Sequence, residues 1–142
     1  MKLVLDANIL IRAVLGSQVS FLLRKYFDQV LLVTPDIAFV EAETHLPRLL
    51  GYRAIPVAQG MAMLDFLHNL VNIIQLSDYA DFENVARQRL DRRDPDDWPM
   101  VAAALTLDCP IWTEDTDFFG CGVATWTSDR VEMFLSTSKI GS

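Results

Sequence analysis

The sequence predicts an α/β domain in which helices cover a mostly parallel sheet. Short apolar runs at residues 2–6 (KLVLD), 30–33 (VLLV) and 72–76 (NIIQL) alternate with longer helical patterns. The first run stops at an acid, and a later one, 110–113 (PIWT), is followed directly by acids. This is typical of buried parallel strands, whose carboxyl ends meet at one edge of the sheet and carry the functional groups.

Common start and stop residues delimit the helices of the first half. Ser17 suits an N-cap, and residues 34–36 (TPD) place proline early and an acid in the first helical turn. Pro47 lies inside the next helical pattern, so a break or kink is expected there, with Gly51 as the separator from the following helix. The expected helices cover 7–15 with closure at Gly16, 17–27, a segment that begins at 34–36, and 56–71.

The second half is organised around residues 94–119. Asp97 stands at the start of a compact apolar helix, and the short strand 110–113 that follows it ends at Glu114. An apolar helix that leads into an apolar strand is half of a parallel-sheet unit. The other expected segments are a strand over 72–76, a helix from Ser77 or Asp78 to about Leu90, a strand over 123–126 and a closing helix over 128–135.

Length and composition indicate one domain over residues 1–135 and a frayed tail over 136–142. The chain has 142 residues, of which 51% are hydrophobic and 22% charged. Cys109 and Cys121 are too few for a disulfide framework, and no apolar run approaches the ~20 residues of a membrane span. Asp6 interrupts the apolar start, which argues against a signal peptide. A cytoplasmic protein with reduced cysteines is therefore expected.

The charge distribution bears on nucleic-acid binding. A net charge of −7 argues against binding through the overall field, for which a basic face is the usual basis. Local patches matter more than the total, however, and bound cations would cancel part of the negative charge. Arg92 and Arg93, just before the acidic loop, are candidates for phosphate contacts, although arginines at a helix end are more often solvated and favoured by the helix dipole.

Four carboxylates, Asp6, Glu41, Asp97 and Asp115, are expected on one rim, each near a strand end or a helix start. Two carboxylates at ~4 Å repel by about 1 kcal/mol even in water, so a positive group should offset them. Mg²⁺ or Mn²⁺ fits this role, because these ions prefer oxygen ligands and no His or Cys cluster is available. Taken singly, each acid is more often a helix cap or a turn residue; the joint placement favours a metal site.

The chain resembles the PIN domain family, and within it the VapC-type toxins of bacterial toxin–antitoxin pairs. The resemblance rests on LDANIL at 5–10, an acid on the helix after the second strand, and DWPMVAAALTLDCPIWTEDTDF at 97–118. It implies an α/β/α sandwich. It also implies that the four acids are catalytic metal ligands, with Asp117 as a further ligand and Asn8 and Thr113 in supporting places.

The same resemblance implies Mg²⁺- or Mn²⁺-dependent cleavage of RNA, with Arg92 and Arg93 as possible contacts to RNA phosphates. A homodimer and a cognate antitoxin protein are implied as well. Two alternatives stay open, a non-catalytic PIN scaffold that binds RNA or a protein and a metal-dependent phosphohydrolase. The phosphohydrolase would need a lysine near the rim, and none of the chain's lysines is well placed; they are Lys2, Lys25 and Lys139.

Two assignments are left open by the sequence. The DPDDW element departs from the plainer helix entry of many family members, so Asp94 or Asp96 could share the role of Asp97. Glu41 and Glu43 are two residues apart, about 200° around a helix, and cannot both face the site. Glu41, about one turn inside the helix, is favoured, with Glu43 solvated.

Overall fold

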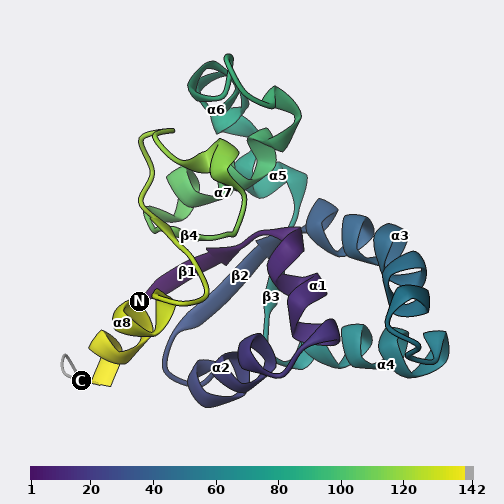
Figure 1. The fold of residues 1–142 in the computed structure, drawn as a ribbon. Coiled ribbons are helices and arrows are strands. Elements are labelled where there is room, and N and C mark those ends of the chain that lie inside the picture. The colour runs from purple at the N-terminus through teal and green to yellow at the C-terminus, as the bar shows by residue number, and fades with distance from the viewer. Residues whose placement is uncertain (140–142) are drawn as a thin grey trace.

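A five-stranded parallel sheet forms the centre of the computed structural model, which describes residues 1–139 (Figure 1). The strand order is β3-β2-β1-β4-β5, and each neighbouring pair is parallel. Leu3, Val4 and Leu5 of the middle strand are fully buried, as expected for a strand covered on both faces. The strands are β1 (Lys2–Leu5), β2 (Leu31–Pro35), β3 (Asn72–Ile74), β4 (Ile111–Trp112) and β5 (Thr125–Trp126).

Helices cover both faces of the sheet, which confirms the predicted α/β/α sandwich. Figure 1 shows α1 to α4 grouped on one side and α5 to α7 on the other. The described helices are α1 (Ala7–Leu15), α2 (Gln18–Tyr26), α3 (Asp36–Tyr52), α4 (Val57–Phe66), α5 (Leu76–Tyr79), α6 (Glu83–Arg89), α7 (Trp98–Leu107) and α8 (Val131–Leu135). Among the described residues, no helix has the length and apolar character needed to cross a membrane.

Helix α7 packs against β1 and β2, and its first seven residues are all buried. A helix that is apolar on every side belongs in an interior rather than on a surface. Asp97 is the residue that immediately precedes it, so the burial of α7 fixes the place of this acid at the edge of the sheet.

Of the break or kink predicted at Pro47, the break is wrong, and so is Gly51 as a separator, because α3 continues through both residues to Tyr52. Proline removes one backbone donor and disturbs the helix locally. Leu46 and Leu50, on either side of Pro47, are fully buried. Packing of this apolar face against the core therefore holds the helix together despite the proline.

The single helix predicted from Ser77 or Asp78 to Leu90 is also wrong, since the chain forms α5, a 3₁₀ turn and α6 there. The cap is Gln75, whose N–H donates to the Asp78 carboxylate at 2.8 Å in a capping box. Tyr79 is buried and its hydroxyl donates to Asp36 of α3 at 2.6 Å. Tertiary contacts thus set the backbone where the sequence pattern suggested one helix.

Elements near the C-terminus are shorter than predicted. The strand expected over 123–126 is limited to β5, and the helix expected over 128–135 begins at Val131. Leu135 still belongs to the same buried core as β1. Of the predicted tail, residues 136–139 form a 3₁₀ helix, and residues 140–142 lie outside the described part of the chain.

Candidate metal centre

The carboxyl edge of the sheet brings together acids from four parts of the sequence. Asp6 directly follows β1, Asp115 lies just beyond β4, Asp97 precedes α7, and Glu41 lies in the second turn of α3. Asp97, Asp115 and Asp117 form the tightest group: each offers one carboxylate oxygen, and these oxygens lie within 4.8 Å of one another. All three side chains are partly buried.

Asp6 occupies the most buried position of the site, with 7% of its surface exposed. Its Oδ1 accepts the N–H of Ala7 at 2.7 Å, so Asp6 also caps α1. Its Oδ2 accepts the hydroxyl of Thr113 and the amide of Asn8, both at 2.8 Å. Burial raises the pKa of Asp6, the three hydrogen bonds lower it in part, and repulsion from Asp115 raises it further.

Thr113 links Asp6 to the neighbouring loop. Its hydroxyl donates to Asp6 and accepts the N–H of Asp115 at 2.9 Å. Asp115 in turn accepts the N–H of Asp117 at 2.9 Å, which orders the 3₁₀ turn Thr116–Phe118. The supporting places predicted for Asn8 and Thr113 are therefore positions in one hydrogen-bonded network with two of the acids.

Glu114 makes different contacts from its neighbour Asp115. Its carboxylate accepts the N–H of Ser128 at 2.6 Å, and its own N–H donates to Asn8 at 3.3 Å. The Ser128 hydroxyl also accepts the indole N–H of the fully buried Trp112 at 3.0 Å. Glu114 thus ties the end of β4 to the segment after β5 and lies outside the group of three acids.

Asp97 carries the largest electrostatic strain of the site. It stands at the N-cap of α7, yet its side chain makes no capping hydrogen bond. Its pKa is raised to about 7, first by burial and then by the repulsion of Asp94, Asp6, Asp115 and Glu41. A carboxylate in this environment gains from a cation beside it, since attraction to the cation favours the charged form and offsets both burial and repulsion.

Glu41 and Glu43 differ in burial, as expected for two residues about 200° apart around a helix. Glu41 is partly buried, and burial raises its pKa, followed by repulsion from Asp6. Glu43 is exposed. The side chain of Glu41 therefore faces the acids, and its role as a ligand stays a prediction.

Asp94 and Asp96, the other two aspartates of the DPDDW element, differ in their surroundings. Asp94 repels both Asp97 and Glu41, so it lies on the side of the acids. Asp96 is 92% exposed, and its Oδ1 lies 3.9 Å from Nη1 of Arg87, a helix residue outside the site. Of the two candidates left open by the sequence, Asp94 is the one that interacts with Asp97, and whether it shares the role of Asp97 stays a prediction.

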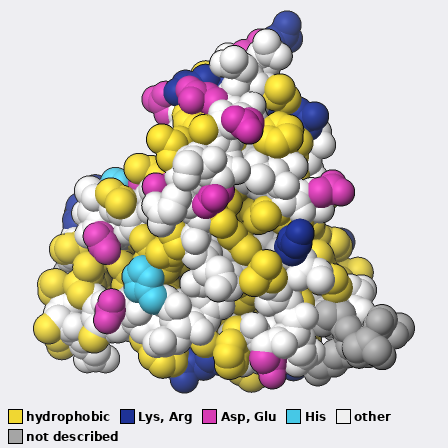
Figure 2. Space-filling model, turned by 180° about the vertical axis from the view of Figure 1, so that it is seen from behind, with side chains coloured by type: hydrophobic (Ala, Val, Ile, Leu, Met, Phe, Trp, Pro, Cys, Tyr) yellow, Lys and Arg dark blue, Asp and Glu magenta, His cyan; other side chains and the backbone are white. Residues whose placement is uncertain are grey.

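Arg92 and Arg93 are both exposed beside the loop that carries Asp94. The guanidinium of Arg93 lies over Gly120, where a Cβ would stand 3.0 Å from Nη2. On the face shown in Figure 2, basic side chains are few and lie among acids, apolar groups and uncharged surface, without a broad basic patch. Contacts of Arg92 and Arg93 to phosphates stay a prediction.

The composition of the site fits a hard divalent cation. The described group of three possible ligands consists of carboxylates alone. Mg²⁺ and Mn²⁺ take oxygen ligands, whereas softer ions favour thiolate or imidazole. Asp97, Asp115 and Asp117 would hold the ion, with Asp6 and Glu41 next to them.

A family model for the PIN domain matches residues 4–136, so the chain belongs to the PIN domain family. Among solved structures, the chain is similar to VapBC2 from Rickettsia felis bound to a DNA fragment from its promoter, with a TM-score of 0.70, 14% identity, and coverage of 89% of this chain and 98% of that one. It is also similar to FitAcB from Neisseria gonorrhoeae, with a TM-score of 0.59, 20% identity, and coverage of 89% and 97%. A search of curated proteins returned no match.

Proposed function

We propose that this PIN domain is a divalent-metal-dependent endoribonuclease and the toxin of a type II toxin–antitoxin pair. The observation that carries the proposal is the placement of three carboxylate oxygens within 4.8 Å of one another at the carboxyl edge of the sheet. Membership of the PIN family, the resemblance of the sequence motifs to VapC-type toxins, and the likeness in fold to VapBC2 and FitAcB support it.

The residues have separable tasks in this mechanism. A bound divalent ion would supply charge neutralisation for the phosphodiester and lower the pKa of the attacking water. Asp97, Asp115 and Asp117 would hold the ion, with Asp6 and Glu41 as the further ligands that the resemblance implies. Asp6 keeps Thr113 in place, and through it the backbone of Asp115. Exposed Arg92 and Arg93 are proposed to contact RNA phosphates, which positions the strand without reading its sequence.

The two alternative functions have less support. A phosphohydrolase with an Asp nucleophile would need a lysine at the carboxyl edge. Lys2 begins β1 at the opposite edge, and Lys25 of α2 pairs with Glu132 of α8 at 2.9 Å. A non-catalytic scaffold would not need to keep three carboxylates close together at a cost in repulsion.

Single substitutions of the two glutamates of α3 by glutamine test the site with little change to the fold. Glu41→Gln should reduce RNA cleavage in Mn²⁺ by about tenfold or more, because its carboxylate faces the acids, and should weaken Mn²⁺ binding as well. Glu43→Gln is the matched control and should leave both nearly unchanged, because Glu43 is exposed. The substrate is total cellular RNA, with EDTA as the metal-free control. Reversed effects would move the ligand assignment to Glu43, and wild-type cleavage that persists in EDTA would contradict the metal mechanism.

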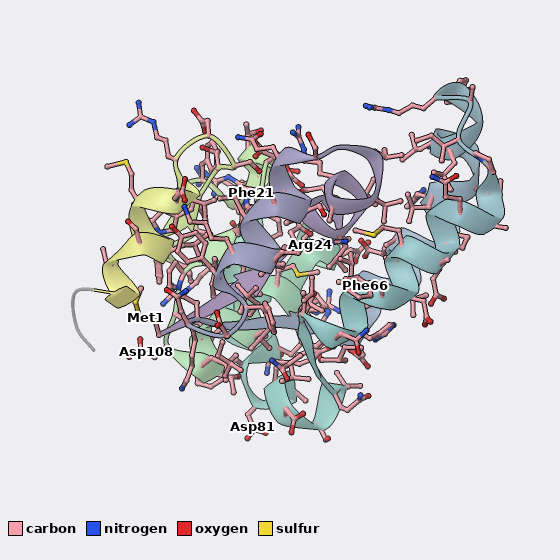
Figure 3. The ribbon with its side chains drawn as sticks, turned by 90° about the horizontal axis from the view of Figure 1, so that it is seen from below. Met1, Phe21, Arg24, Phe66, Asp81 and Asp108 are labelled. Carbon is pink, nitrogen blue, oxygen red and sulfur yellow. The ribbon has the colours of Figure 1, made fainter. Side chains whose placement is uncertain are left out.

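We propose an antitoxin as the protein partner and the groove between α1, α2 and α4 as its docking surface. The groove encloses about 510 Å³ and its apolar lining includes Val14, Ile55, Met63 and Phe66. Arg24 of α2 lies 5.1 Å from the ring centre of Phe66 of α4, and both are labelled in Figure 3. Phe21 of α2 and Phe66 are exposed. Exposed aromatic side chains beside an apolar groove are typical anchors for an amphipathic helix.

This partner surface has a direct test. The product of a short neighbouring gene, co-expressed with the chain, should co-purify with the wild type, and Phe66→Glu should weaken binding by more than about tenfold. Equal binding by the variant would contradict the groove as the docking surface.

We also propose that the protein forms a homodimer in the cytoplasm, where Cys109 and Cys121 would stay reduced. A monomeric mass in light scattering would contradict the dimer.

A further inference from the structure

Two loops carry the three acids of the candidate metal centre. The first, residues 90–97, follows α6 and ends at Asp97. The second, residues 113–122, follows β4 and includes Asp115 and Asp117. The distance from Asp97 to the other two carboxylates therefore depends on how the two loops are held against each other.

Arg89, the last residue of α6, joins the base of the first loop to the second. Its Nη1 donates to the carbonyl of Cys121 at 3.3 Å. The guanidinium also lies against Gly122, where a Cβ would stand 2.5 Å from Nη1, closer than packed atoms allow. Gly122 has a φ of +88°, a conformation that favours glycine. Glycine at this position thus permits both the backbone conformation and the approach of Arg89.

The carbonyl held by Arg89 belongs to a well-packed part of the second loop. Cys121 is buried, and its N–H donates to the carbonyl of Phe118 at 3.2 Å. Phe118 is fully buried and ends the 3₁₀ turn that contains Asp117. The N–H of Asp117 donates to Asp115 at 2.9 Å. An unbroken set of contacts therefore leads from Arg89 to the two carboxylates of the second loop.

We infer that Arg89 is a positioning residue of the metal centre, which sets the distance between Asp97 and the Asp115–Asp117 pair through its contacts with Cys121 and Gly122. The inference rests on the proposed function, because it assigns a task toward the metal ion. Arg89 acts through the backbone of the second loop.

A purely electrostatic role of Arg89 and a positioning role predict opposite changes in Mn²⁺ affinity when the side chain is removed, which makes the inference testable. Loss of a positive charge near a cation site should strengthen cation binding. Loss of a positioning contact should weaken it, by about tenfold at the lower end of the 10–100-fold range found for groups that orient metal ligands. The direction of the change in Kd for Mn²⁺ thus separates the two roles.

The experiment measures Mn²⁺ binding to the full chain by calorimetry and by the electron paramagnetic resonance signal of free Mn²⁺. Arg89→Met should raise the Kd about tenfold. Arg89→Lys should recover part of the affinity, because its ammonium can still donate to the Cys121 carbonyl. Arg48→Met is the control for the loss of one positive charge: Arg48 is an exposed residue of α3 outside the two loops, and its loss should not weaken binding.

Gly122→Ala provides a second route, because its Cβ would displace the Arg89 guanidinium. The same Cβ also meets the positive φ of Gly122, which strains the backbone whatever residue stands at 89, so the loss of Mn²⁺ affinity should be at least that of Arg89→Met. Equal or tighter Mn²⁺ binding by Arg89→Met, or by Gly122→Ala, would overturn the inference. Equal Mn²⁺ binding by the wild type and Asp97→Asn would instead overturn the metal centre itself, so the two failures are distinguishable.

Discussion

Asp97→Asn and Asp115→Asn should each reduce Mn²⁺-dependent RNA cleavage by about a hundredfold or more. The two carboxylates belong to the group of three whose oxygens lie within 4.8 Å, and the ion that they hold is expected to supply several kcal/mol of transition-state stabilisation. About 1.4 kcal/mol corresponds to a factor of ten in rate. Asp6→Asn should have a comparable effect, since it disturbs the hydrogen bonds that order Thr113. Cleavage of labelled RNA under single-turnover conditions measures all three.

Two control variants test whether such losses are local. Asp108 ends α7 at the far end from Asp97 and lies beside Met1, as Figure 3 shows. Its φ of +50° suits Asn as well as Asp, so Asp108→Asn should keep the fold and the activity. Glu114→Gln is a closer control, because its Oε1 can still accept the Ser128 N–H. A loss in Asp108→Asn equal to that in Asp97→Asn would mean that the site is misplaced.

Much of the fold was predictable because local signals and burial agree in it. The run Lys2–Leu5 is apolar and stops at an acid, and it forms the buried central strand. The wrong predictions fall where tertiary contacts override local signals. Pro47 is tolerated because α3 buries Leu46 and Leu50, and the helix expected over residues 77–90 is interrupted where Tyr79 is buried and bonds to Asp36.

The candidate site was predictable where its residues follow strands or precede helices. Asp6, Asp97 and Asp115 could be placed on one edge from the order of elements alone. The task of Arg89 had no such signal, since its partner is a backbone carbonyl 32 residues away in the chain. The different tasks of Glu114 and Asp115, which are neighbours in sequence, likewise depend on side-chain directions set by Ser128 and Asp117. Which acids bind metal stays a prediction.

Asp97→Asn should raise the melting temperature when no metal is bound, whereas most substitutions lower it. In EDTA at pH 8, the variant should melt a few degrees above the wild type, because it removes a carboxylate that is repelled by Asp94, Asp6, Asp115 and Glu41. No capping bond is lost, since the Asp97 side chain makes none in α7.

The pH dependence of the wild type in EDTA should follow from the same carboxylate. The pKa of Asp97 in the folded protein, about 7, is raised above the ordinary value of 3.8, so the folded state binds the proton more tightly than the unfolded state. The stability due to protonation is fully present below about pH 4 and is lost as the pH rises to about 7. The wild type should therefore gain on the variant between pH 8 and pH 5, and their difference in melting temperature in EDTA should be smaller at pH 5 than at pH 8.

Thermal unfolding of the wild type and Asp97→Asn at pH 8, in EDTA and in millimolar Mn²⁺, tests most directly whether these acids form a metal site. A ligand that binds the native state stabilises it by RT ln(1 + [L]/Kd), about 2.7 kcal/mol at a hundred times Kd. Mn²⁺ should raise the melting temperature of the wild type by several degrees and that of the variant much less. The predicted result is that the variant melts higher in EDTA and the wild type melts higher in Mn²⁺. The same ranking in both conditions would contradict a metal site that includes Asp97.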